Sequence, residues 1–104
     1  MKTKYRKNGY SRETALNYID EKKAVQSLST ELETRVKFED GNPTDEIDSY
    51  RAWFSQEGAG AFEVKFFDRI SLPKYMSIIT FDELEACEVG NDVYFRAQGI
   101  EVVK

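Results

Sequence analysis

Aromatic and basic side chains are interleaved along three stretches of the chain, a combination that can bind a ligand with flat rings and negative charge. If these stretches are strands, every second residue lies on the same face. Arg51 then shares a face with Trp53, and Tyr94 shares a face with Arg96. Exposed rings can stack on unpaired bases while neighbouring cations meet phosphates. The residues predicted to bind nucleic acid in this way are Arg51, Trp53, Lys65, Phe67, Arg69, Lys74, Tyr94 and Arg96.

Catalytic chemistry finds little support in the composition. The chain has no histidine and a single cysteine, Cys87, which argues against zinc sites, histidine general bases and serine or cysteine triads. Gly58-Ala59-Gly60 precedes a predicted strand rather than a helix, so it predicts a turn and not a phosphate loop. The acidic run 39–46 lacks the ligand spacing of a calcium loop. We therefore expect a protein that is not an enzyme and holds no metal or cofactor.

Charge is unevenly distributed along the 104 residues. The net charge is −4, but five basic residues precede the first acid, Glu13, and 10 bases face 19 acids from there onward. This division predicts a flexible basic arm over residues 1–12 and an acidic domain over 13–104. The arm suits a polyanion or an acidic partner, and it would equally serve as a solvated tail. No apolar run is long enough for a membrane anchor, and with one cysteine we expect a cytoplasmic protein.

Period-two alternation defines the elements that must position these side chains. It predicts strands over 34–38, 47–54, 62–67 and 93–97, with further strands over 76–81 and 100–103. Val25, Leu28 and Leu32 recur at helical spacing, but residues 27–30 are also compatible with a strand, and we expect a strand there. Residues 82–89 fit either a continued strand or one helical turn. Ser11 can cap a short helix near the start. The predicted fold is therefore mainly β, a small five- to six-stranded antiparallel OB-like barrel with a short N-terminal helix.

The same alternation separates core from surface. Five residues share faces with other apolar side chains and are predicted to be core: Tyr50, Phe62, Val64, Phe66 and Phe95. Trp53, Phe67 and Tyr94 share faces with basic residues, which leaves exposure and burial equally open for them.

Several short runs from Leu32 onward follow the pattern of one protein family. They are Arg35-Val36-Lys37 before Asp40-Gly41, Thr44-Asp45-Glu46-Ile47, Phe62-Glu63-Val64 after its glycine turn, Leu72-Pro73-Lys74-Tyr75 and the closing run 92–104. In these runs the segment resembles the YdcP-like proteins of integrative and conjugative elements, a family that includes helicase processivity factors. The resemblance implies a gene-five-like single-strand DNA-binding barrel, acting with a helicase or relaxase in rolling-circle replication and DNA transfer.

Two functions stay open. The first is an accessory protein of mobile-element DNA replication and transfer that binds single-stranded DNA, assists a helicase, or does both. The second is an acidic protein-interaction module that docks on a helicase or nuclease, or mimics DNA as an inhibitor, without binding DNA itself. An exposed edge strand would also permit a homodimer.

Overall fold

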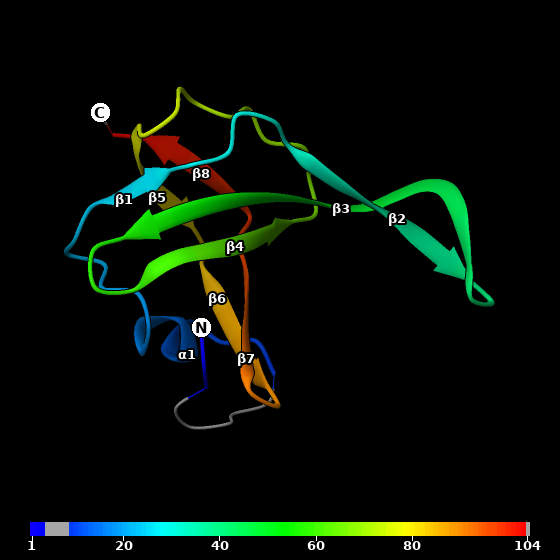
Figure 1. Cartoon of the computed structure of the whole chain (residues 1–104), viewed down its shortest axis with the longest axis horizontal. Coiled ribbons are helices and arrows are strands. Elements are labelled where there is room, and N and C mark those ends of the chain that lie inside the picture. The colour runs from blue at the N-terminus through cyan, green and yellow to red at the C-terminus, as the bar shows by residue number, and fades with distance from the viewer. Residues whose placement is uncertain (4–8, 104) are drawn as a thin grey trace.

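The computed structural model describes residues 1–3 and 9–103, which are built mainly from strands (Figure 1). One short helix, α1 (Arg12–Leu16), precedes eight strands in this part of the chain. The strands are β1 (Val25–Ser27), β2 (Glu33–Glu39), β3 (Asn42–Gln56), β4 (Gly60–Phe66), β5 (Ile78–Asp82), β6 (Glu85–Val89), β7 (Asp92–Arg96) and β8 (Gly99–Val102). No helix among the described residues is long and apolar enough to cross a membrane. The mainly β prediction with one short helix is confirmed.

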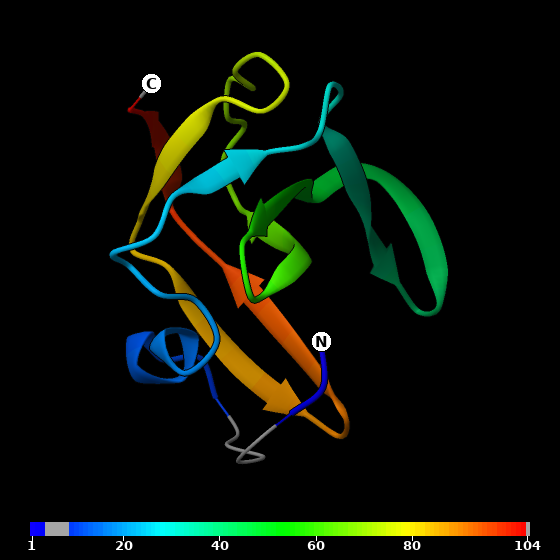
Figure 2. The same cartoon turned by 60° about the vertical axis from the view of Figure 1, so that its left-hand side comes forward.

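All eight strands belong to one mixed sheet. Its order is β6-β7-β4-β3-β1-β5-β8, and β2 pairs with β3 beside this path. β4 and β7 run parallel, with Val64 opposite Phe95, while the other strand pairs are antiparallel. The sheet curls around its core, yet its terminal strands β6 and β8 do not pair with each other (Figure 2). The prediction of an antiparallel OB-like barrel of five to six strands is therefore wrong in strand number and in strand direction, and the sheet does not close into a barrel.

The separation of β6 from β5 has a local cause. Glu83 has a φ of 56°, a left-handed conformation that ends β5 at Asp82 and turns the chain into β6. β6 then forms a hairpin with β7 through a turn at Gly90 and Asn91. This hairpin docks on β4 in parallel, a pairing between distant segments that strand periodicity cannot reveal.

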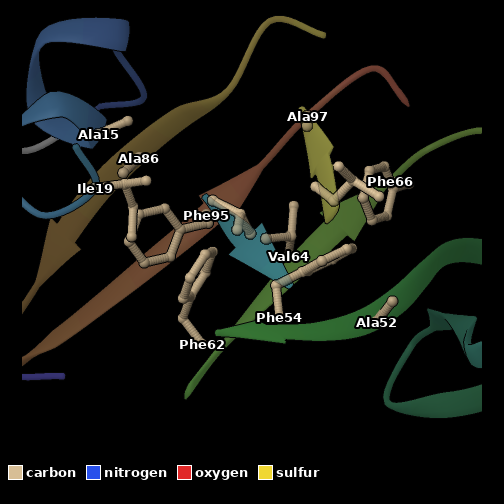
Figure 3. Close-up of a cluster of buried hydrophobic side chains, with 12 residues drawn as sticks. Ala15, Ile19, Ala52, Phe54, Phe62, Val64, Phe66, Ala86, Phe95 and Ala97 are labelled. Carbon is tan, nitrogen blue, oxygen red and sulfur yellow. The ribbon is translucent and has the colours of Figure 1, made fainter. Parts of the chain in front are cut away.

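Buried aromatic side chains fill the inside of the curled sheet (Figure 3). Phe54 has no exposed surface and meets Phe81 edge-on, with 4.9 Å between ring centroids, while Phe62 lies 5.2 Å from Phe95. Four of the five predicted core residues, Phe62, Val64, Phe66 and Phe95, are buried, and Tyr50 packs half-buried against them. The faces assigned by alternation are thus confirmed for the central strands.

Ser11 places α1 on the sheet as well as capping it. Its Oγ accepts a hydrogen bond from the Thr14 backbone N–H at 3.1 Å, as predicted for the cap. Its own backbone N–H and C=O both pair with Ala86 of β6, at 3.0 Å each. The helix therefore packs beside β6 with Ala15 turned into the core, and Ile19, in the turn that follows the helix, joins the same core.

A buried glutamine fixes the connection between α1 and β1. Gln56, at the end of β3, is only 3% exposed. Its Oε1 accepts from the Asp20 N–H at 2.9 Å, and its Nε2 donates to the carbonyls of Asp20 and Lys23 at 2.7 and 3.2 Å. Three backbone groups of an irregular segment are satisfied by this one side chain.

The predicted basic arm is only partly within the described residues. Residues 4–8, with Lys4, Arg6 and Lys7, lie outside them. On one side of that stretch, Thr3 bonds to the carbonyls of Asn91 and Gly90; on the other, Ser11 pairs with Ala86. Both flanks therefore attach to the β6–β7 hairpin, and Arg12 already belongs to α1.

The β2–β3 hairpin extends away from the rest of the sheet (Figure 1). Asp40 and Gly41 form its turn with φ values of 51° and 79°, as a two-residue hairpin turn of the I′ type requires. Every residue of β2 is exposed. Register shifts after Arg35 and Val36 add residues to β3, so Val36 faces Ile47 and Phe38 faces Pro43.

Candidate nucleic-acid interface

Three neighbouring strands bring most of the predicted binding residues onto one surface. Arg51 of β3 pairs with Lys65 of β4, which in turn pairs with Arg96 of β7. These residues alternate with the buried Ala52, Val64 and Phe95, so their side chains project from the side of the sheet opposite the core.

A second row lies directly beside the first. Trp53 pairs with Glu63, and the parallel register of β4 and β7 sets Tyr94 on the other side of Glu63. We call the surface formed by Arg51, Trp53, Glu63, Lys65, Tyr94 and Arg96 the outer face. A hollow of about 290 Å³ opens on it.

The aromatic side chains that the sequence left open are all exposed. Trp53 is 41%, Tyr94 43% and Phe67 56% exposed. Trp53 and Tyr94 both line the hollow. Phe67 follows the end of β4, where its ring lies 5.0 Å from the Lys65 Nζ. Because these rings are already exposed to solvent, they can stack on a flat ligand without any rearrangement of the core.

Two of the outer-face cations are held by carboxylates. Arg51 Nη1 lies 3.3 Å from Glu63 Oε1, and Arg96 Nε lies 2.9 Å from Glu85 Oε1, with all four side chains partly exposed. Arg51 Nε is buried and has no hydrogen-bond partner among residues 1–3 and 9–103. Among the described residues no acid pairs with Lys65, whose Nζ instead lies near two rings. Lys65 is therefore the cation most ready to meet an anion.

Tyr10 completes the surface from the opposite end of the chain. Its ring centroid lies 4.1 Å from the Arg96 Cζ and 5.6 Å from the Lys65 Nζ. Burial, together with the neighbouring Cys87 to which it hydrogen-bonds, raises the pKa of Tyr10 to about 12. Tyr10 therefore stays a neutral phenol at physiological pH.

Two predicted residues lie away from the outer face. The Arg69 Cζ lies 5.9 Å from the ring of Tyr50, which belongs to the core side of β3. Lys74 lies in the connection between β4 and β5, beside β1, where the Met76 N–H donates to the Ser27 carbonyl at 2.6 Å. The structure thus gathers Arg51, Trp53, Lys65, Tyr94 and Arg96, places Phe67 at their margin, and separates Arg69 and Lys74 from them.

Sequence reasoning missed two residues of this surface. Glu63 shares a face with Lys65 by simple alternation, so the period itself could have identified it. Tyr10 gave no such signal, because it lies in the segment predicted to be a flexible arm. Within residues 1–3 and 9–103, no group of three or more histidine, cysteine, aspartate or glutamate side chains could hold a metal ion.

Comparison with known proteins gives no relative: no protein-family model, no curated protein and no solved structure matches the chain. The resemblance to the YdcP-like family therefore stays a prediction that rests on its short runs alone.

Proposed function

We propose that this protein binds single-stranded DNA on its outer face, as a non-enzymatic accessory of mobile-element DNA replication and transfer. One observation carries the proposal: the strand register sets a row of cations, Arg51, Lys65 and Arg96, beside a row that holds the exposed rings of Trp53 and Tyr94. Bases would stack on the rings while the backbone follows the cations. Such a role implies a cytoplasmic protein.

The ion pairs set the strength of this binding. A phosphate that approaches Arg51 or Arg96 competes with Glu63 or Glu85 for the guanidinium, so only part of its attraction is gained. If all three cations of the row meet phosphates, the logarithm of the affinity falls with the logarithm of salt concentration by a slope of about −2. This is a modest salt dependence, in keeping with an acidic protein.

Trp53 provides a direct test because it is the only tryptophan of the chain. Titration with a thymidine oligonucleotide at low salt should quench its fluorescence as bases stack on it. Anisotropy of a labelled oligonucleotide should show that Tyr94→Ala weakens binding by about 1–3 kcal/mol, the usual contribution of one stacked base. Trp53→Ala should have a similar effect.

The matched control is Tyr75→Ala, which removes a tyrosine ring that is even more exposed than Tyr94 from the connection between β4 and β5. It should bind as the unmodified protein does. No binding of single-stranded DNA at low salt, or equal losses in Tyr75→Ala and Tyr94→Ala, would contradict the proposal.

The β2–β3 hairpin favours a second candidate, docking on a protein such as a helicase or relaxase. Val36, Phe38 and Ile47 expose 38%, 63% and 48% of their surface on a two-stranded ribbon with no core of its own. Phe38→Ser should then abolish stimulation of the partner helicase while leaving DNA binding intact. Unchanged stimulation would remove this candidate.

A further inference from the structure

We propose that Glu63 makes the outer face selective for guanine, by accepting hydrogen bonds from the Watson–Crick edge of an unpaired base. The inference rests on the proposed function and adds to it a base preference and the residue that sets it. Its basis is the position of a carboxylate between two exposed rings.

Glu63 lies at the centre of the second row of the outer face. Trp53 pairs with it on one side, and the register of β7 sets Tyr94 on the other. All three residues line the same hollow. A base that stacks against either ring there has its polar edge close to the carboxylate, because neighbouring strands lie only about 4.8 Å apart.

The Glu63 carboxylate is oriented but not saturated. Its Oε1 accepts from Arg51 Nη1 at 3.3 Å, which fixes the side chain across the β3–β4 pair. Within the described part of the chain, no hydrogen bond involves the other carboxylate oxygen, and the side chain keeps 24% of its surface exposed. An ionised carboxylate offers about four acceptor positions, so capacity for a ligand remains.

The chemistry of an acceptor-only group selects among the four bases. Guanine alone presents two adjacent donors, N1–H and N2–H₂, that one carboxylate can accept together. Cytosine and adenine each place an acceptor nitrogen beside their amino group, and thymine flanks its single N3–H with two carbonyls. These acceptors oppose Glu63, so a base without paired donors is disfavoured while guanine is stabilised.

The neighbouring cations could also bind guanine, by an edge other than the Watson–Crick edge. The experiment must therefore distinguish recognition by Glu63 from recognition by a cation. Arginine and lysine bind guanine through O6 and N7, the opposite side of the base. Hypoxanthine lacks the N2 amino group but keeps O6 and N7. The analogue 7-deazaguanine lacks N7 but keeps both Watson–Crick donors. The two analogues therefore respond in opposite ways to the two modes of recognition.

The test compares labelled thymidine oligonucleotides that carry isolated guanines, adenines, cytosines, hypoxanthines or 7-deazaguanines at the same positions. Guanine and 7-deazaguanine should bind at least about fivefold more tightly than the others, the lower end of what a bidentate base contact discriminates. Glu63→Gln should remove this preference and strengthen binding to plain thymidine, since it removes a negative charge near the phosphates. The glutamine Oε1 can still accept from Arg51, and a thermal melt verifies the fold.

Asp92→Asn is the matched control. Asp92 lines the same hollow from the start of β7 and is exposed, so the substitution removes an equal charge from the hollow but not from between the rings. It should keep the guanine preference.

The outcomes distinguish the inference from the function on which it rests. Equal binding of all the oligonucleotides, a preference kept by hypoxanthine but lost with 7-deazaguanine, or a preference that survives in Glu63→Gln overturns the role of Glu63 and leaves DNA binding in place. No binding of any oligonucleotide overturns both.

Discussion

The ring of Tyr10 stacks on the guanidinium of Arg96, with 4.1 Å between the ring centroid and Cζ. The two residues come from opposite ends of the chain. Tyr10 also hydrogen-bonds to Cys87, which pairs with Tyr94 in the β6–β7 hairpin. A residue of the N-terminal segment thus covers one margin of the outer face and the only thiol of the protein.

This contact predicts that Tyr10 protects Cys87 from modification. Cys87 is buried in the intact structure, so a thiol reagent should react slowly with the folded protein. Tyr10→Ala should raise the rate of reaction several-fold, because it removes the group in contact with the sulfur. The colour released by an aromatic disulfide reagent measures this rate.

Tyr10→Phe is the control for the covering ring, since it removes the hydroxyl but keeps the bulk. It should retain most of the protection. If the thiol of a folded Tyr10→Ala protein reacts no faster than that of the unmodified protein, Tyr10 is not what covers Cys87.

The raised pKa of Tyr10 predicts a loss of stability in alkali. The unfolded chain loses this proton at the ordinary tyrosine pKa of 10.0, whereas the folded protein holds it until about 12. Between these values the unfolded state binds fewer protons, so the free energy of unfolding falls as the pH rises. The loss should be about 1 kcal/mol, less than the full shift implies, because the half-exposed ring is screened by water.

Urea denaturation at pH 9 and at pH 11.5 measures this loss. Other tyrosines and lysines also titrate in this range, so the comparison is with Tyr10→Phe, which lacks the titrating hydroxyl. The unmodified protein should lose more stability than the variant over the interval. Parallel profiles would show that the phenol does not carry the effect.

Gln56 should be among the most sensitive polar residues of the fold. Its side chain satisfies three backbone groups, and Gln56→Ala leaves them without partners in a nearly closed site. We expect a loss of about 2–4 kcal/mol in the free energy of unfolding. Chemical denaturation measures it.

Gln26 of β1 provides the comparison for Gln56. Its Oε1 accepts a long hydrogen bond of 3.5 Å from Ser55 Oγ, and the residue is half-exposed. Gln26→Ala should therefore change stability by no more than about 0.5 kcal/mol. Similar losses in both variants would argue against the anchoring role of Gln56.

Local periodicity was sufficient to predict the part of the outer face that lies on the β3–β4 hairpin. The alternation of Ala52 with Trp53 and of Val64 with Lys65 indicated which of these side chains lie on the same face of the sheet. The turn at Gly58-Ala59-Gly60 indicated that β3 and β4 are neighbours. Side chains on adjacent strands of a hairpin must then lie together, because the turn fixes the register.

The remaining half of the surface could not be predicted in this way. Tyr94 and Arg96 join it through the parallel pairing of β4 with β7, which depends on tertiary packing between distant segments. Glu83 adopts a positive φ without being glycine or asparagine, so the division between β5 and β6 left no mark in the residue types. Arg69 and Lys74 were included for their charge, although they lie in a connection whose path periodicity does not describe.

The parallel junction between β4 and β7 also bears on how the protein comes to fold. Each hairpin, β3–β4 and β6–β7, closes a short loop, but bringing them together requires ordering the chain between Phe66 and Asp92. Contacts between such distant segments form slowly relative to local ones. During synthesis, β3 and β4 leave the ribosome with Trp53 and two of the three cations, Arg51 and Lys65, before Tyr94 and Arg96 of β7 exist. A nascent chain therefore carries an incomplete surface until β7 has emerged and docked on β4, and binding competence should arise as a late, single event.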